Sequence, residues 1–305
     1  MKNVIFTLFL LVSFTVIGQD FEKNWKNVIE FEEIGSIKSA NDEVAKIYKK
    51  AKRKNNDLEL IKTFFFRAKY MQVLEEDAQV KIISELKTDI ATVSEPGKSL
   101  LEFVYVSCIN EYLLQNKYKI QRRTETEAVA QDNFLTWTLP DFEKETIKYF
   151  LKLSQNNAVL KNKPLKEYEQ LLDFEKLDNI ENLSLYEFLL KKHIALYTRH
   201  LNQYEDNAIF FSPIETKVFG STKEFLSISF DSLSNTNLKN TSLLYQELER
   251  LHPDDETLDF ERIQFYENYV FRKDANYLSI LNRYQKRVSD TALFRKVQLA
   301  RANLY

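Results

Sequence analysis

Few side chains in this sequence have a type and a setting that could support a reaction. The single cysteine, Cys108, lies in the apolar stretch of residues 102–114, which has helical spacing. A reactive thiol needs polar, positively charged surroundings that favour the thiolate, whereas a thiol among apolar side chains packs as a small, inert group. We therefore predict that Cys108 is buried and unreactive; a nucleophile or a thioester is the alternative. A single cysteine leaves no internal disulfide.

The three histidines are the next candidates, as metal ligands. His193 and His200 are seven residues apart on one predicted helix, so they share a face but lie two turns apart. Two ligands from one helix usually stand three or four residues apart, and no cysteine or third histidine is nearby. His252 belongs to another segment. We expect surface or interface histidines, no metal site and no cofactor.

The acidic residues and glycines form no motif of a known enzyme class. Residues 75–77 and 254–256 are acidic clusters at expected turns and helix starts, where carboxylates stabilise the positive end of the helix dipole. The chain has 4 glycines, too few to build nucleophile-elbow, phosphate-binding or dinucleotide-binding loops, and their patterns are absent. We predict that the protein is not an enzyme. An enzyme with an unrecognised site is the weaker alternative.

Aromatic side chains are common enough to form either a core or a binding surface. The sequence has 23 Phe, 16 Tyr and 2 Trp, which make up 13% of its residues. Aromatic rings at helical spacing usually fill the space between packed helices, and we prefer this interpretation. The alternative is a concave groove for a peptide or a protein, as helical repeat proteins often have.

The elements that would position these side chains are predicted to be helices. Glycine and proline number only 4 and 5, whereas tight turns between antiparallel strands need many of them. Abundant Lys, Glu and Leu suit helix interiors. We therefore predict an all-α protein of stacked antiparallel helical hairpins. A spacing of roughly 35 to 40 residues per pair suits a tetratricopeptide-like solenoid, although the consensus of that repeat is not cleanly met.

Apolar periodicity and capping signals predict where each helix lies. A first helix should end near Gly35, and the basic run 49–54 should close a second as a solvated helix end rather than a nucleic-acid patch. Thr138 and Ser184 should open helices with capping boxes. The further helices are expected at residues 58–74, 78–90, 100–118, 142–153, 164–172, 184–201, 242–251, 259–271, 276–288 and 292–305.

The same pattern predicts the organisation of the chain. Residues 1–18 form a separate leader, and residues 19–201 form an N-terminal region of helical hairpins. Residues 202–240, rich in Ser, Asn and Thr, are expected to be an irregular linker. Residues 241–305 form the C-terminal hairpins.

The first 20 residues have the pattern of an export signal. Lys2 precedes an apolar run over residues 4–17, and Gly18 and Gln19 follow it. A basic start, roughly 14 apolar residues and a small residue are typical of a cleaved signal peptide, and a membrane span needs about 20. We predict cleavage near Gln19, a periplasmic or extracellular protein, and no membrane span in the mature chain. The net charge of −2 gives no reason to expect nucleic acid.

Several segments resemble the N-terminal helical region of Bacteroidetes alpha-2-macroglobulin-family proteins. They occur in the family's order and cover essentially the whole mature chain: residues 25–35 (WKNVIEFEEIG), 39–54, 121–127 (QRRTETE), 136–139 (TWTL), 163–172 (KPLKEYEQLL), 184–195 (SLYEFLLKKHIA) and 244–252 (LYQELERLH). The resemblance implies kinship with protease traps, which have macroglobulin β-domains, a bait region and, in some members, a Cys-Gly-Glu-Gln thioester. Here Cys108 is followed by Ile-Asn-Glu, and no segment reads as a β-sandwich.

These observations lead to two competing functional interpretations, both with a protein as the partner. The first is an exported helical scaffold, the N-terminal part of a macroglobulin-like protease inhibitor, which is not inhibitory alone. The chain would then be a truncated product or one piece of a split gene. The second is a stand-alone extracytoplasmic solenoid that binds peptides or proteins. A macroglobulin-like reading frame downstream would favour the first.

Overall fold

The computed structural model describes residues 19–123, 133–172, 182–204, 215–233, 236–253, 255–267 and 274–303. Within these ranges the chain is helical, and extended pairing is limited to one isolated bridge between Pro164 and Ser184. The all-α prediction is therefore confirmed. The predicted signal peptide, residues 1–18, lies outside the described residues. Of the helices that are described, none has the length and apolarity needed to cross a membrane.

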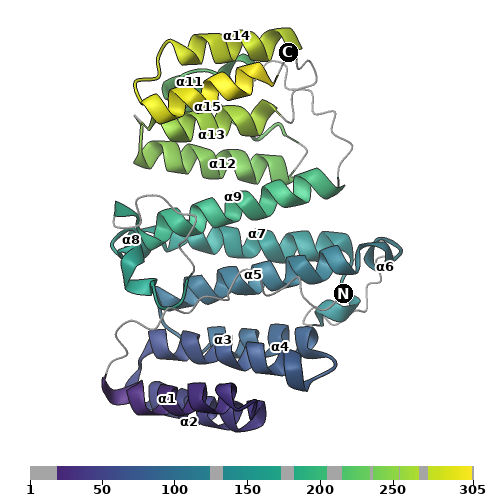
Figure 1. The fold of residues 1–305 in the computed structure, drawn as a ribbon. Coiled ribbons are helices and arrows are strands. Elements are labelled where there is room, and N and C mark those ends of the chain that lie inside the picture. The colour runs from purple at the N-terminus through teal and green to yellow at the C-terminus, as the bar shows by residue number, and fades with distance from the viewer. Residues whose placement is uncertain are drawn as a thin grey trace. The chain divides into compact units, whose positions relative to one another are not determined.

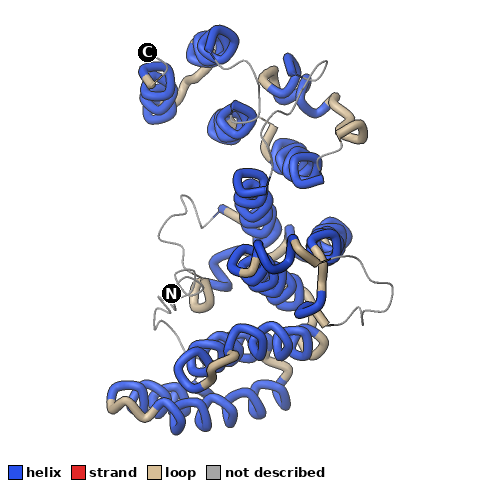
Figure 2. The backbone as a smooth tube through the Cα atoms, turned by 90° about the vertical axis from the view of Figure 1, so that its right-hand side faces the viewer, coloured by secondary structure: helices blue, strands red, loops and turns tan. Residues whose placement is uncertain are grey.

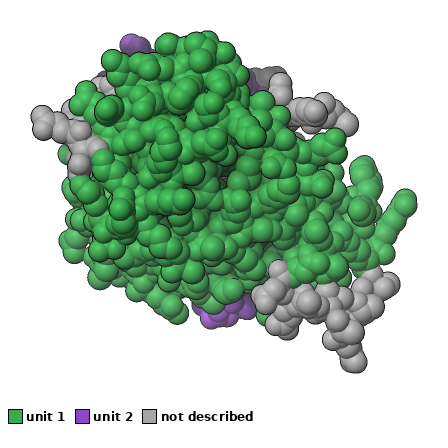
Figure 3. All heavy atoms as spheres, turned by 90° about the horizontal axis from the view of Figure 1, so that it is seen from below, with its two compact units in different colours: residues 1–189 green, residues 190–305 purple. Residues whose placement is uncertain are grey.

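The chain divides into two compact units, residues 1–189 and 190–305, which Figure 3 shows in separate colours. The first unit is a series of helices that runs from α1 to α8 in Figure 1, with two 3-10 turns, η1 and η2. Its elements are α1 (Gln19–Glu33), α2 (Ile37–Lys54), α3 (Asp57–Leu74), α4 (Ala78–Ile90), α5 (Gly97–Gln115), α6 (Lys117–Gln121), η1 (Phe134–Thr136), α7 (Leu139–Gln155), α8 (Asn157–Lys161) and η2 (Leu165–Tyr168).

Successive long helices of the first unit pack side by side as hairpins (Figure 2). α1 packs on α2, α2 on α3, α3 on α4, α4 on α5 and α5 on α7. Two residues with left-handed backbone allow tight reversals, Gly35 (φ 72°) after α1 and Asn55 (φ 50°) after α2. Glycine adopts this conformation without a steric penalty, and asparagine tolerates it. The predicted hairpin stack is confirmed.

The start of α5 differs from its prediction for a local reason. The helix begins at Gly97, earlier than expected, because the carboxylate of Glu95 accepts hydrogen bonds from the Ser99 amide (3.2 Å) and hydroxyl (2.8 Å). This carboxylate satisfies a donor that the first turn of a helix leaves unpaired. Residues 164–172, expected to form a short helix, contain only the 3-10 turn η2.

Both predicted capping boxes are present. At the start of α7 the amide and the hydroxyl of Thr138 donate to the Asp141 carboxylate, at 2.9 and 2.7 Å. At Ser184 the amide donates to the Glu187 carboxylate (2.8 Å), and the Glu187 amide donates to the Ser184 hydroxyl (3.3 Å). Such reciprocal bonds mark where a helix must begin. Ser184 therefore opens α9 (Leu185–Tyr204).

Charged groups are enclosed between α1 and α3 in the core of the first unit. Trp25 is fully buried, and its indole N–H donates to the Glu59 carboxylate at 2.7 Å. The ammonium group of Lys62 lies 4.4 Å from the centre of the Trp25 ring, and Phe66 packs on the same ring at 4.7 Å. Burying the cation without such partners would cost several kcal/mol. The pattern of residue types alone did not indicate this cluster.

The second unit holds the rest of α9 and the later helices. They are α10 (Glu215–Val218), α11 (Thr222–Leu226), α12 (Thr236–Leu251), α13 (Glu256–Glu267), α14 (Asp274–Gln285) and α15 (Thr291–Ala302). α10 packs on α11 and α13, α11 on α12, α12 on α13, and α14 on α15.

The structure differs from the expected linker over residues 202–240. The boundary between the units lies within α9, and residues 215–233 belong to the second unit. Val218 and Phe225 in this segment are fully buried. The polar composition of residues 215–233 does not indicate that they pack into the second unit. A few buried apolar side chains can hold such a segment in place when neighbouring helices donate hydrogen bonds to its backbone.

Candidate functional site

Cys108 lies on α5 in a setting that does not activate its thiol. The side chain is half-buried, and burial, followed by the Glu111 carboxylate, raises the pKa of the thiol to about 12. Such a thiol is protonated at neutral pH, whereas nucleophilic attack and metal binding need the thiolate. The raised pKa fits the expected lack of reactivity, whereas the half-buried position differs from the full burial that was predicted.

The two histidines whose side chains are described belong to different elements, His193 to α9 and His252 to the segment directly after α12. His193 is 2% exposed on α9, which differs from the expected surface position. Leu189, Leu190 and Tyr197, which lie one turn away on the same helix, are buried as well. His252 is exposed at the end of α12, and the side chain of His200 lies outside the described residues. In the described ranges, no group of three or more His, Cys, Asp or Glu could hold a metal ion.

The aromatic side chains form the core rather than a groove. Tyr112 packs on Phe134 with ring centres 5.1 Å apart, and Trp137 packs on Phe142 at 5.2 Å. Among the residues with a described side chain, Tyr118 is the single exposed aromatic, at 81%. The core interpretation of the aromatic residues therefore holds for this part of the chain.

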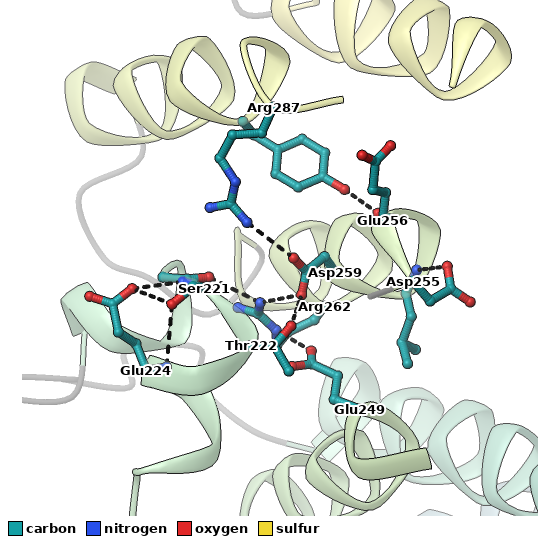
Figure 4. A network of polar contacts seen from close by, with 12 residues as sticks. Ser221, Thr222, Glu224, Glu249, Asp255, Glu256, Asp259, Arg262 and Arg287 are labelled. Carbon is teal, nitrogen blue, oxygen red and sulfur yellow. Dashed lines mark hydrogen bonds and ion pairs between the residues drawn. The ribbon is translucent and has the colours of Figure 1, made fainter. Parts of the chain in front are cut away.

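A cluster of charged groups lies inside the second unit, around Arg262 of α13 (Figure 4). The guanidinium is fully buried and donates to Asp259 (2.8 Å), to Glu249 and to the carbonyls of Val218 and Gly220 (3.1 Å). Five N–H donors in a fixed plane suit such a set of acceptors. Arg262 thus joins α12, α13 and the end of α10.

Within this cluster, Glu249 lies in a setting that disfavours its ionised form. Its side chain is 1% exposed, and burial, opposed by the charge of Arg262, raises the pKa of the carboxyl to about 7. Its Oε2 atom has no hydrogen-bond partner among the described residues. Asp259 shares the charge of Arg262 with Glu249 and is itself contacted by Arg287 at 3.5 Å. At Glu249, burial outweighs the favourable charge of Arg262. The cluster is enclosed by helices, and this favours a structural role over acid–base chemistry.

Gln246, like Arg262, binds the backbone of residues 215–233. The amide of Gln246 on α12 donates to the carbonyls of Phe225 and Ile228, both at 3.0 Å, and Gln246 is 2% exposed. A buried carbonyl without a donor would cost about 1–3 kcal/mol. Arg262 and Gln246 together satisfy backbone groups that residues 215–233 cannot pair within their own short helices.

A surface cavity of about 360 Å³ in the first unit is a candidate for ligand binding. It lies where the turn between α2 and α3 meets the start of α5 and the turn η2. Its walls are formed by Lys54, Asn55, Asn56, Asp57, Leu58, Ile61, Pro96, Gly97, Lys163, Glu167 and Tyr168. This volume lies at the lower end of the range of ligand-binding pockets.

The walls of this cavity combine charged, polar and apolar groups. Asp57 accepts hydrogen bonds from the amide (3.3 Å) and the hydroxyl of Ser94. Lys163 and Glu167 form an ion pair at 3.9 Å, with both side chains about half exposed. Tyr168 is 4% exposed. Burial, and then the carboxylates around it, of which Glu167 contributes most, raise the pKa of its hydroxyl, which therefore stays protonated.

Sequence reasoning missed both the buried cluster and the cavity. Arg262 and Glu249 lie on different helices and meet only because these helices pack together. No local sequence motif indicates such a pair. Lys163, Glu167 and Tyr168 stand out in the sequence only as part of a segment with a family resemblance. A charged residue on the apolar face of a predicted helix, such as Arg262 between Leu258 and Tyr266, is the one signal that could have indicated the cluster.

No protein-family model matches the sequence, and no curated protein or solved structure matches it significantly.

Proposed function

We propose that this chain is an exported helical scaffold whose role is to make protein–protein contacts. The observation that supports it best is the hairpin stack of the first unit, in which α1 to α5 and α7 pack in succession. Stacked hairpins present long surfaces whose side chains can vary without disturbing the core. The predicted signal peptide supports export.

An apolar surface cluster of the first unit, composed of Ile34, Val73 and Leu74, is suited to such a contact. These side chains are 75%, 67% and 48% exposed. Ile34 comes directly after α1, and Val73 and Leu74 are the last two residues of α3. The ion pair between Glu32 and Lys69, at 2.6 Å, joins α1 and α3. Exposed apolar groups rimmed by charges are typical of protein interfaces.

The family resemblance narrows the proposed partner. We infer that the chain belongs to a macroglobulin-like protease-inhibitor system and docks onto another part of that system. The described residues fold as helices, whereas trapping in that family uses β-domains and a bait region. This supports a docking role rather than inhibition by this chain alone.

Site-specific photocrosslinking in the native host tests the scaffold proposal. We expect a photoreactive residue at Ile34 or Val73 to capture one exported protein of defined mass, because these side chains would be buried in the contact. The adduct should come from the extracytoplasmic fraction and carry a mature N-terminus near Gln19. Leu74→Asp should abolish it.

The matched control places the same photoreactive residue at Lys144, an exposed position on α7. An equal pattern of adducts from Lys144, or recovery of the intact Met1 chain from the cytosol alone, would contradict the proposal.

The second candidate function is a stand-alone peptide-binding solenoid, and the cavity beside η2 favours it. Its walls offer hydrogen-bonding side chains next to apolar ones, a combination that binds short segments rather than folded surfaces. Binding of short peptides without any adduct from Ile34 or Val73 would favour this candidate over the first.

A further inference from the structure

The first three helices of the first unit end in two regions of opposite charge. α1 and α3 run in the same direction, because Trp25 bonds Glu59 and, further along both helices, Glu32 pairs with Lys69. α2 packs on both helices and runs the other way, since a short turn joins it to each. The ends of α1 and α3 therefore lie beside the start of α2, and the starts of α1 and α3 lie beside the end of α2.

We call the first of these regions the acidic end. It holds the apolar surface cluster described above, and two of its ion pairs are internal, Lys69 with Glu32 and Lys81 with Glu75. The other charged groups there are one lysine and four exposed carboxylates that form no ion pair with a described residue: Lys38, Glu30, Glu33, Glu76 and Asp77. The acidic end therefore carries a surplus of three negative charges.

Two of these carboxylates lie where their own helix disfavours them. Glu30 and Glu33 are three residues apart at the end of α1, so they share a face and repel each other. The C-terminal end of a helix also carries a partial negative charge, and the last turn of α1 contains no basic residue. A cation supplied by another molecule would relieve both effects.

The second region, the basic end, has the complementary composition. Lys49, Lys52 and Arg53 share one face of α2, are exposed and pair with no described carboxylate. The dipole of α2 stabilises cations in its last turn, but Lys49 lies before that turn. Leu58, at the start of α3, adds an apolar side chain that is 42% exposed.

The acidic groups nearby do not cancel the charge of these three cations. Glu59 and Lys62 are buried together beside Trp25. The remaining charges at this end and around the adjoining cavity balance in number: Lys23, Lys50, Lys54, Lys98 and Lys163 with Asp20, Glu22, Asp57, Glu95 and Glu167. Lys49, Lys52 and Arg53 therefore form a surplus of three positive charges.

The two surpluses are too far apart to compensate each other within one molecule. α3 has 18 residues and is thus about 27 Å long, whereas physiological salt screens exposed charges beyond about 8 Å. Contact between two copies would bring the same charges together and cover apolar side chains at both ends. We propose that copies of this chain associate head to tail, with the acidic end of one copy on the basic end of the next.

This inference rests on the proposed function, because it uses the same apolar cluster as a contact surface, and it names a second copy as one occupant. The contact joins different surfaces of the two copies, so any assembly that does not close into a ring keeps one acidic end uncovered. That end remains available to the exported partner. Self-association and docking onto another protein are therefore compatible.

Analytical ultracentrifugation of the purified chain tests the proposal. We expect the average mass to rise above that of one chain as the concentration increases. The dissociation constant should rise about tenfold when sodium chloride is raised from about 50 mM to about 500 mM, because salt screens the opposed charges.

Two charge-reversal variants identify the surfaces. The acidic-end variant carries Glu33→Lys and Glu76→Lys, and the basic-end variant carries Lys52→Glu and Arg53→Glu. Each variant alone has two ends of like sign, so its self-association should be at least tenfold weaker. An equimolar mixture unites the unaltered basic end of one variant with the unaltered acidic end of the other, and should associate as the unchanged chain does. Unfolded variants could not produce this recovery.

A control variant makes the same change in net charge away from both ends. It carries Lys144→Glu and Arg295→Glu, at exposed positions on α7 and α15, and should associate as the unchanged chain does. Leu74→Ser removes apolar surface without changing the charge, and should weaken association severalfold. Circular dichroism checks that each variant is folded.

Three results would overturn the proposal. These are a chain that stays monomeric at low salt, a mixture of the two reversal variants that does not associate, or an equal loss of association in the control variant. A monomeric chain that still forms an adduct with another exported protein from Ile34 would leave the scaffold proposal intact. Self-association without such an adduct would have the opposite meaning, and an adduct of two copies is recognised by its mass.

Discussion

At the scale of single residues, the structure places its most unusual side chains in interiors rather than on surfaces. Arg262 is fully buried, Glu249 is 1% exposed beside it, and Lys62 is 3% exposed over the ring of Trp25. The type of each residue was visible in the sequence, but its partner was not. Pairing depends on which helix faces meet, and a single sequence contains no direct measure of this.

The raised pKa of Glu249 predicts how the second unit responds to pH. The folded state holds this proton up to about pH 7, whereas the unfolded chain releases it near 4.5. The folded state binds the proton more tightly, so the contribution of Glu249 to stability falls as pH rises from about 4.5 to 7, by up to about 3 kcal/mol. Glu249→Gln should remove this part of the pH dependence, measured by urea denaturation between pH 5 and 8.

The control for this measurement is Glu247→Gln on the same helix, where the side chain pairs with Arg250 near the surface. This variant should show the same dependence of the free energy of unfolding on pH as the unchanged protein. If Glu249→Gln shows the same pH dependence as the control, the Glu249 carboxyl does not titrate in this pH range in the folded protein.

At the scale of elements, sequence reasoning located helices better than it located boundaries between units. α4 begins and ends where predicted, because apolar periodicity and acidic flanks agree there. α5 was misplaced by a few residues, because the Glu95 side chain that starts it lies before the proline expected to separate two helices. The composition of residues 215–233 predicts a linker, because the side chains that bind their carbonyls, Gln246 and Arg262, are distant in the chain. The cavity could not be predicted, since it arises from three turns that meet only in the fold.

The capping box at the start of α7 permits a test at this scale. Thr138→Ala removes the hydroxyl that bonds the Asp141 carboxylate at 2.7 Å, and should lower the free energy of unfolding by about 1 kcal/mol. Ser154→Ala, near the end of the same helix, is the control, since its hydroxyl lies 3.5 Å from the Phe150 carbonyl, at the limit of hydrogen bonding. Chemical denaturation should separate the two variants; equal loss in both would argue against a specific role of the box.

At the scale of the whole molecule, the proposed docking role predicts what the chain does not do alone. A protease trap blocks cleavage of large substrates while small substrates are still cleaved. We expect the purified chain to leave a protease's activity on both kinds of substrate unchanged, because the described residues supply only helices. Loss of activity on large substrates alone, at one chain per protease, would refute the docking role.

The hydrogen bonds that hold the backbone of residues 215–233 have a consequence for how the sequence of this protein can diverge. Arg262 and Gln246 bind carbonyl oxygens of Val218, Gly220, Phe225 and Ile228. Every amino acid has that carbonyl, so these bonds restrict the path of the backbone and not the identity of the residues along it. Burial adds the demand that Val218, Phe219, Phe225, Ile228 and Phe230 be apolar. In distant relatives the sequence of this stretch can therefore change while Arg262 and Gln246 are retained. A sequence alignment would then fail to match the segment although its fold is unchanged.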